Sequence, residues 1–132
     1  MPKSIKNYLV FGTFLVVFLD QISKRLFLFY FPDKFFCNQN LAWGITLPLW
    51  IFWPILITFL AYLFILTGKK PSFFLFLVLG GALSNLFDRL FLGCVVDWIV
   101  LYRFPIFNLA DVAISFGTIG FFWQYRKNFL FS

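Results

Sequence analysis

The chain has 132 residues, enough for one domain, and it is 62% hydrophobic, 25% aromatic and only 12% charged. A water-soluble domain of this size cannot bury so much apolar side chain, so the composition predicts an integral membrane protein. The net charge of +6 does not indicate a nucleic-acid partner, because the basic residues lie at the ends of apolar runs and form no stripe among polar neighbours.

Four apolar stretches are long enough to cross the hydrocarbon core of a bilayer, which takes about 20 helical residues. They cover 8–31, about 49–67, 72–92 and the segment between Arg103 and Arg126. No small-x-small cleavage site follows the first stretch, so we expect it to remain as an uncleaved helix. The sequence therefore predicts an all-α membrane protein with four transmembrane helices in a single domain, 1–132.

Lysine and arginine are distributed unevenly between the two sides of this four-helix arrangement. One side carries Lys3, Lys6, Lys69, Lys70, Arg126 and Lys127, and the other carries mainly Lys34 and Arg103. The positive-inside rule therefore places both termini and the turn at 68–71 in the cytoplasm. The longer connections, at roughly 32–48 and 93–104, are expected to face outward.

Ionisable and polar residues inside the predicted spans are costly in lipid, so each is a candidate functional residue. On the first span, Asp20 and Lys24 lie one helical turn apart and can pair. On the third span, Gly81, Asn85 and Asp88 share a face, and the run of small residues from Gly80 would allow close helix contact. We expect Asp88 to brace its neighbour Arg89 or a helix end.

The fourth span repeats polar residues at steps of 3, 4 and 3. These are Asn108, Asp111, Ser115 and Thr118, which predicts a single helix face turned away from lipid. Apart from the last two, the polar residues of all three spans lie toward the outer ends of their helices. The sequence therefore predicts one polar site near the outer surface.

Asp97 and Asp111 are candidates for a catalytic pair of carboxyl groups. Only thirteen residues separate them, so the chain can fold back and bring the two side chains together. Two close carboxyl groups share a proton, and one can act as a general base on water while the other donates a proton to the substrate. Because the chain has no histidine, Ser-His-Asp and Cys-His catalysis are excluded, and we expect neither a metal ion nor another cofactor.

Two other classes of protein also place acids inside membranes. A small channel or proton-coupled transporter would carry charge along a path through both leaflets, whereas the inner halves of these spans carry almost none. A non-catalytic helical bundle would use Asn108 and Asp111 as interhelical contacts. The two cysteines, Cys37 and Cys94, both fall on the outer side; a disulfide is possible, but the absence of a cysteine framework favours buried free thiols.

Four blocks of the sequence occur in the order of a known set of motifs. They are Asp20-Gln21-Ile22-Ser23-Lys24, then Asn38-Gln39-Asn40-Leu41-Ala42-Trp43-Gly44, then Gly80-Gly81-Ala82 with Asn85, Asp88-Arg89, Gly93, Val95 and Asp97-Trp98, and finally Phe107-Asn108-Leu109-Ala110-Asp111. In these blocks the chain resembles the lipoprotein signal peptidase family, also called signal peptidase II, over nearly its whole length.

This resemblance implies a four-helix protein of the bacterial inner membrane, with a small β-like cradle on the outer side that clamps the substrate. It implies an aspartic endopeptidase whose catalytic pair is Asp97 and Asp111. The residues implied to line or support the site are Asp20, Lys24, Asn38, Asn85, Arg89, Asn108 and Ala110. The implied substrate is a prolipoprotein held by membrane lipids and cut just before its diacylglyceryl-modified cysteine, and globomycin-type inhibitors are expected to block the cut.

The chain departs from the family pattern at two positions. Asn40 stands where the family usually has glycine, which affects the turn that presents Asn38, although asparagine tolerates left-handed backbone angles. Ser84 stands before Asn85 where glycine is common, and it is expected to widen the contact of the third helix slightly. Neither position belongs to the aspartate pair.

Overall fold

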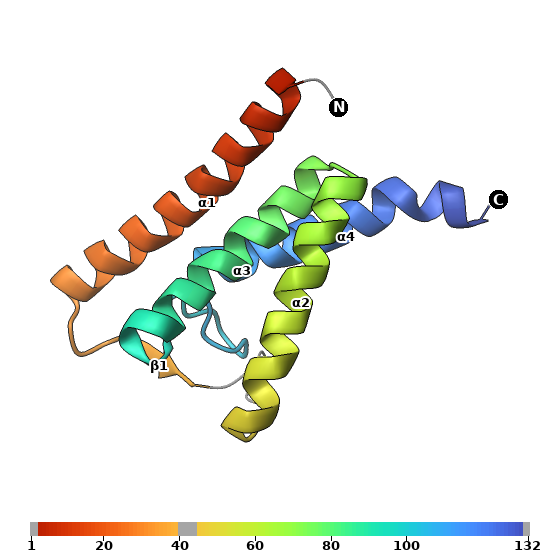
Figure 1. Cartoon of the computed structure of the whole chain (residues 1–132). Helices are drawn as coiled ribbons and strands as arrows, with labels where there is room; N and C mark the ends of the chain where they lie inside the picture. The colour runs from red at the N-terminus through yellow and green to blue at the C-terminus, as the bar shows by residue number, and fades with distance from the viewer. Residues whose placement is uncertain (1–2, 40–44, 131–132) are drawn as a thin grey trace.

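The computed structural model describes residues 3–39 and 45–130, which form four long helices and two short strands (Figure 1). In chain order these elements are α1 (Lys3–Tyr30), β1 (Phe36–Asn38), α2 (Leu49–Lys69), α3 (Phe73–Leu92), β2 (Val95–Asp97) and α4 (Leu109–Leu130). The four predicted helices are present. The first begins earlier than predicted, at Lys3, and the fourth is shifted toward the C-terminus.

Within the described part of the chain, α2 and α3 are long and apolar enough to cross a membrane, with mean hydropathies of 2.3 and 1.5. The other two helices are as long or longer, with 28 residues in α1 and 22 in α4, but they carry more polar side chains. Charged residues in both helices, together with amides and hydroxyls in α4, lower their hydropathy. The two helices with the clearest membrane signal are thus the pair joined by the short turn after Lys69.

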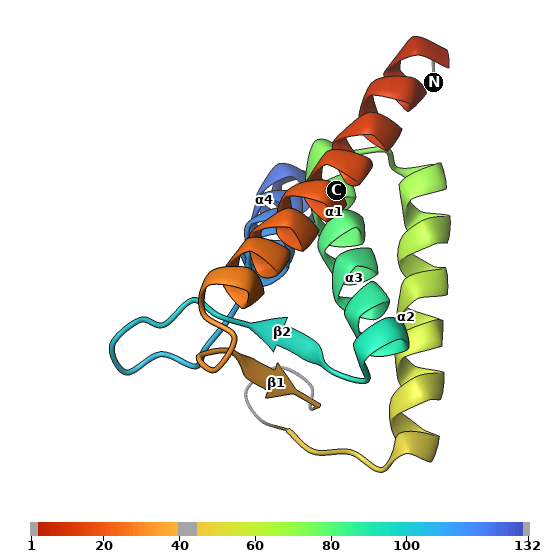
Figure 2. The ribbon, with the colours of Figure 1, turned by 90° about the vertical axis from the view of Figure 1, so that its left-hand side faces the viewer.

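Helix α3 lies at the centre of the bundle and contacts each of the other helices (Figure 2). Two adjacent glycines allow this. A Cβ atom on Gly80 would lie 2.9 Å from the Cβ of Val16 on α1, and one on Gly81 would lie 2.5 Å from the backbone oxygen of Ala110 on α4. The prediction of close helix contact at these glycines is confirmed, and it applies to both faces of α3 at once.

The predicted polar face of α4 is wrong for two of its four residues. Ser115 and Thr118 are exposed, whereas Ala110 and Gly117 are buried. Small residues let α4 approach α3, so the contact follows them and turns the hydroxyl groups outward. Thr118 needs no other helix to satisfy its hydroxyl, which donates to the backbone oxygen of Ile114 at 2.7 Å.

Strands β1 and β2 form a small antiparallel sheet at one end of the bundle. Phe36 pairs with Asp97, and Asn38 pairs with Val95. Figure 2 shows this sheet at the opposite end from the N-terminus and from the turn between α2 and α3. The residues after β2 fold back on themselves, because Ile99 forms a further antiparallel bridge with Phe107 just before α4.

Cys37 and Cys94 form a disulfide, so the prediction of free thiols is wrong. Their Cα atoms lie 5.4 Å apart, within the range that a disulfide requires. Pairing of Cys37 with Val96 brings β1 alongside the segment that enters β2, which a count of cysteines along the chain cannot reveal. The bond joins segments 57 residues apart and ties the two strands of the sheet together.

Candidate active site

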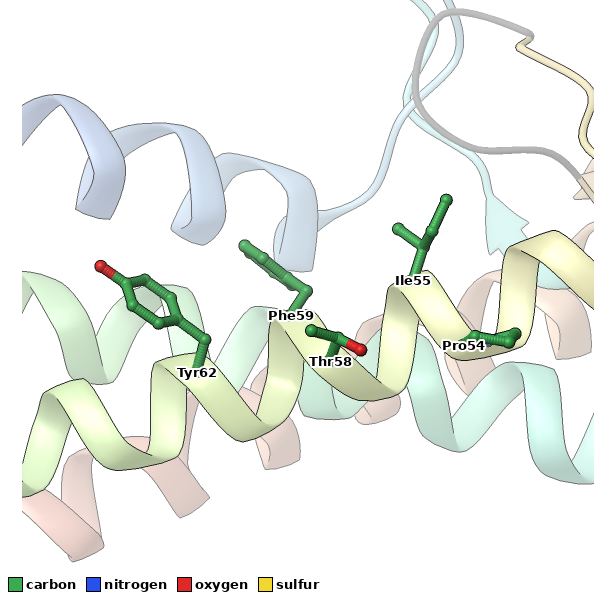
Figure 3. A pocket seen from close by; sticks show the side chains of 5 residues that line it. All are labelled: Pro54, Ile55, Thr58, Phe59 and Tyr62. Carbon is green, nitrogen blue, oxygen red and sulfur yellow. The ribbon is translucent and has the colours of Figure 1, made fainter.

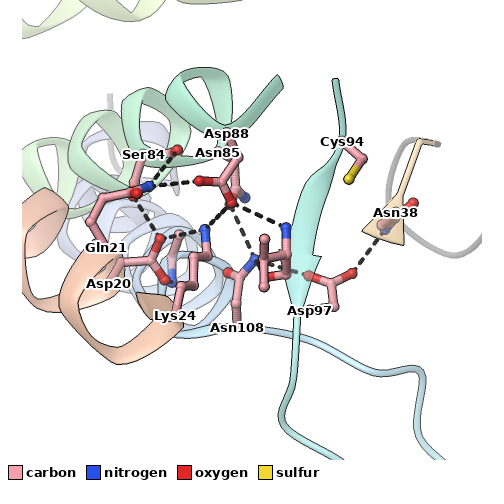
Figure 4. Close-up of polar contacts among 12 residues, drawn as sticks. Asp20, Gln21, Lys24, Asn38, Ser84, Asn85, Asp88, Cys94, Asp97 and Asn108 are labelled. Carbon is pink, nitrogen blue, oxygen red and sulfur yellow. Dashed lines mark hydrogen bonds and ion pairs between the residues drawn. The ribbon is translucent and has the colours of Figure 1, made fainter. Parts of the chain in front are cut away.

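The amino group of Lys24 lies at the centre of a buried polar cluster contributed by α1 and α3 (Figure 4). Its Nζ atom lies 2.5 Å from Oδ2 of Asp20 and 2.8 Å from Oδ2 of Asp88, and it donates to Oδ1 of Asn85 at 3.2 Å. The predicted pairing of Asp20 with Lys24 is confirmed. A buried cation is tolerated only when charge and hydrogen-bonding partners surround it, and this one has both.

Asp88 pairs with Lys24 of another helix, a partner that the sequence did not indicate. Its Oδ2 atom also accepts the backbone N–H of Val96 at 3.1 Å, so Asp88 holds β2 against the end of α3. The guanidinium group of its neighbour Arg89 lies over the ring of Phe52 on α2, with its Cζ atom 5.2 Å from the ring centroid. The cluster at Asp88 therefore fixes the strand that carries Asp97.

Asp20 fixes the start of α4 in the same way. Its Oδ1 atom accepts the backbone N–H of Ala110 at 2.8 Å, across 90 residues of chain. Ala110 is the second residue of α4, where backbone N–H groups have no partner within the helix and a carboxylate is favoured. Asp20 of α1 thus caps the N-terminus of α4. Ala110, which the resemblance implied as a site residue, takes part in this contact through its backbone N–H.

Asp111 lies in the first turn of α4 and forms a reciprocal cap with Asn108. The backbone N–H of Asp111 donates to Oδ1 of Asn108 at 2.9 Å, and the backbone N–H of Asn108 donates to Oδ2 of Asp111 at 3.2 Å. This is the capping-box arrangement, with asparagine and aspartate in place of the usual residues. Asn85 of α3 adds a third bond, from Nδ2 to Oδ1 of Asp111 at 3.0 Å.

Asp97 is the last residue of β2 and is 1% exposed. Its Oδ1 atom accepts Nδ2 of Asn108 at 2.9 Å, and its Oδ2 atom accepts Nδ2 of Asn38 at 3.0 Å. Burial raises the pKa of Asp97 to about 6; the hydrogen bond from Asn38 opposes the rise, and the charge of Asp111 adds to it. The carboxyl group of Asp97 can therefore exchange a proton near neutral pH.

The structure connects the two aspartates through the side chain and the backbone of Asn108. The same residue donates to Asp97 from its amide and to Asp111 from its backbone, and it also accepts a bond from Asp111. Asn85 supports this bridge, because its Oδ1 atom accepts Nδ2 of Asn108 at 3.2 Å. Among the described residues, each oxygen of both carboxyl groups thus accepts one N–H and keeps capacity for a proton or a water molecule.

The amides that surround the two carboxyl groups are oriented by their own partners. Oδ1 of Asn85 accepts bonds from both Lys24 and Asn108, so its Nδ2 is directed at Asp111. Gln21 and Ser84 belong to the same cluster and were not predicted as site residues. Gln21 was part of the first sequence block, but its partners on α3 could not be read from α1 alone. Asn40 lies outside the described residues.

A separate hollow of about 510 Å³ runs along α2 and contains no member of the polar cluster. It is lined by Pro54, Ile55, Thr58, Phe59 and Tyr62, whose side chains are shown in Figure 3. The lining carries no charged group. This hollow has the character of a lipid-facing groove, whereas the chemistry of the molecule is concentrated at the end that carries β1 and β2.

Comparisons with a family model and with known proteins indicate the same family. The family model described as signal peptidase (SPase) II matches residues 12–127. The lipoprotein signal peptidase of Blochmanniella pennsylvanica (strain BPEN) is 34% identical, over 72% of this chain and 69% of that protein. The lipoprotein signal peptidase of Moorella thermoacetica (strain ATCC 39073 / JCM 9320) is 60% identical over a 48-residue stretch, which covers 36% of this chain and 32% of that protein.

Two solved structures, each described as a bacterial membrane enzyme, share the fold. One has a TM-score of 0.79 and 27% identity and covers 92% of this chain and 89% of its own. The other has a TM-score of 0.73 and 26% identity and covers 89% of this chain and 92% of its own. The likeness therefore extends over nearly the whole molecule.

Proposed function

The chain belongs to the signal peptidase (SPase) II family, a family of aspartic proteases, and we propose that Asp97 and Asp111 are its catalytic pair. The protein is a membrane enzyme that removes signal peptides from prolipoproteins. The observation that carries the proposal is the bridge at Asn108, which bonds to both carboxyl groups within one buried network. The amide donors around the pair suit a shared proton, because they stabilise an ionised carboxylate without supplying a competing acid.

In the proposed reaction, the pair starts with one carboxyl group ionised and the other protonated. The ionised group takes a proton from water as the water oxygen attacks the carbonyl carbon of the scissile peptide bond, while the protonated group donates to the carbonyl oxygen. Collapse of the tetrahedral intermediate breaks the C–N bond: the group that took the proton from water passes it to the leaving amine, and a hydroxyl group of the intermediate returns its proton to the other carboxylate. The products are a carboxyl group and an amine, and the pair returns to its starting charge.

We also propose that all four helices span the bacterial inner membrane, with both termini in the cytoplasm. The basic residues support this orientation, because Lys3, Lys6, Lys69 and Arg126 lie at the ends of helices that are away from β1 and β2. The catalytic pair would then open toward the outer surface. A cysteine introduced at Lys69 should react with impermeant reagents only from the cytoplasmic side, and labelling from outside intact cells would contradict the orientation.

The proposed substrate is a prolipoprotein whose cysteine already carries diacylglycerol, and the cut falls just before that cysteine. Acyl chains in the outer leaflet hold such a substrate at the depth of Asp97 and Asp111, since each buried methylene contributes about 0.8 kcal/mol to membrane binding. The small sheet of β1 and β2 would clamp the peptide beside the pair. Globomycin-type inhibitors are expected to occupy the same place and block cleavage.

The test is release of signal peptide from a purified diacylglyceryl-modified prolipoprotein by the purified protein in detergent. Asp97→Asn and Asp111→Asn should each abolish release while the protein remains folded, because asparagine keeps the size of the side chain but cannot pass a proton. Since the two groups act as a unit, the double variant should be little worse than either single one. Near-normal turnover of Asp97→Asn would overturn the catalytic pair.

A further inference from the structure

The hydroxyl group of Ser84 is completely buried between α3 and α1, with a relative exposure of 0%. It donates to Oδ2 of Asp20 at 2.6 Å and accepts Nε2 of Gln21 at 3.0 Å (Figure 4). Gln21 can only donate through this nitrogen, so the single hydrogen of the hydroxyl is directed at Asp20. The two hydrogen bonds therefore run in one direction: Gln21 donates to Ser84, and Ser84 donates to the carboxylate of Asp20.

The orientation of Gln21 is also fixed by groups other than the Ser84 hydroxyl. Its Nε2 atom also donates to Oδ1 of Asp88 at 2.8 Å and lies 3.2 Å from the backbone oxygen of Ser84. All three neighbours of this nitrogen are acceptors, so the amide group cannot be turned around without losing its bonds. Ser84 thus receives a donor whose position is set by both α1 and α3.

The carboxylate that Ser84 holds is the one that caps α4. Asp20 binds the hydroxyl and Lys24 through Oδ2, and it binds the backbone N–H of Ala110 through Oδ1. Ala110 directly precedes Asp111 along the chain. Rotation of the Asp20 side chain would therefore be transmitted to the first turn of α4, where the reciprocal cap of Asp111 with Asn108 is formed.

We propose that Ser84 is a positioning residue of the reaction, which holds Asp20 in the rotamer that places Asp111. This inference rests on the proposed function, since Asp111 is one of the proposed catalytic groups. In this chain the expectation that Ser84 merely widens the helix contact gives way to a specific bond.

A structural role alone would lower stability without changing turnover, and Ser72 provides the matched control. It is 4% exposed, it also lies on the α3 segment, and its hydroxyl donates to Oε1 of Gln124 at 2.7 Å. Ser72 precedes the first residue of α3, whereas Ser84 lies near the end that carries Asp97 and Asp111. Replacing either serine with alanine removes one buried hydroxyl. Ser72→Ala removes one side-chain hydrogen bond to another helix, and Ser84→Ala removes two, those to Asp20 and Gln21.

The experiment compares kcat, KM and melting temperature for Ser84→Ala, Ser72→Ala and the unmodified protein, with diacylglyceryl-modified prolipoprotein as substrate. Both variants should melt earlier, but only Ser84→Ala should lower kcat, by about 3- to 10-fold, the loss expected for one hydrogen bond. KM should change by less than about twofold, because the hydroxyl does not touch substrate. Equal kcat for the two alanine variants would overturn the proposal.

A double-mutant cycle tests the route through Asp20. Adding Ser84→Ala to Asp20→Asn should cause no further loss of kcat, whereas independent effects would multiply and contradict the route. If Ser84→Ala does not fold, Ser84→Gly also removes the hydroxyl and should show the same fall in kcat. Active Asp111→Asn would refute the proposed function itself, while inactive Asp111→Asn with normal Ser84→Ala would refute only this inference.

Discussion

Asn38 donates from its side-chain amide to Oδ2 of Asp97 at 3.0 Å, across the two-stranded sheet. This bond favours the ionised carboxylate and opposes the effect of burial on its pKa. Asn38→Ala should therefore raise the pKa of Asp97 further above 6. In a pH profile of kcat/KM, the limb that reports Asp97 should move to higher pH, whether Asp97 serves as acid or as base. Asp33→Asn, which alters an exposed acid in the preceding turn, should leave the profile in place.

The raised pKa of Asp97 also predicts how stability depends on pH. The folded protein binds the proton more tightly than an unfolded chain, whose aspartate has the ordinary pKa of 3.8. The stabilisation is complete below that pH and is lost as the pH rises through about 6. Asp97→Asn should remove this component, which amounts to at most about 3 kcal/mol. The difference in melting temperature between the two proteins, measured in detergent from pH 4 to 7, should change with pH; parallel curves would contradict the shift.

Loss of the bond between Cys37 and Cys94 should lower both stability and turnover. Opening a loop of this length costs about 4 kcal/mol by the chain-entropy model, less if helix packing already restrains the unfolded chain. Turnover should fall because Asn38 and Asp97 lie next to the joined segments. Thermal unfolding and peptide release with and without dithiothreitol measure both effects. The double variant Cys37→Ser with Cys94→Ser should resemble the reduced protein and show no response to the reductant.

Substitution of Gly81 tests whether close approach of α3 and α4 is needed to place Asp111. An added Cβ would meet the backbone oxygen of Ala110 at 2.5 Å, and backbone cannot yield as a flexible side chain can. Gly81→Ala should destabilise the protein by about 1–3 kcal/mol and lower turnover as the first turn of α4 moves away. Gly12→Ala is the control, because nothing lies within 4 Å of its added Cβ and alanine is the better helix former. Similar melting temperatures for the two variants would contradict the close-packing argument.

The helices could be predicted from the sequence because their signals are local. Length and hydropathy placed α2 and α3 to within a few residues, and the spacing of Asp20 and Lys24 on one helix predicted their ion pair. The partner of Asp88 could not be predicted, because Lys24 lies on another helix and its approach depends on how α1 crosses α3. Periodicity also failed for Ser115 and Thr118, where the packing of small residues decided which face of α4 turned inward.

The contacts that complete the candidate site depend on long-range geometry. Ser84 was marked only as a departure from a glycine pattern, and its bond to Asp20 spans 64 residues. Likewise, the disulfide follows from the register of β1 against β2, two strands of three residues each that have no strong propensity signal. Sequence patterns identified Asp97 and Asp111 as candidates, whereas the amides that orient them had to be located in three dimensions.

Under the proposed orientation, formation of the bond between Cys37 and Cys94 would depend on which side of the membrane β1 and β2 reach. Thiols stay reduced in most cytosolic environments, so the bond closes once both segments reach an oxidising compartment. In a molecule inserted in the opposite orientation this disulfide would not form. The strand that carries Asn38 would then lack its covalent link to the segment that leads to Asp97. The disulfide would thus form only in correctly inserted molecules, and only these would work at full rate. Under the proposed orientation, the enzyme would complete its own oxidation at the outer surface before it processes its substrates at full rate.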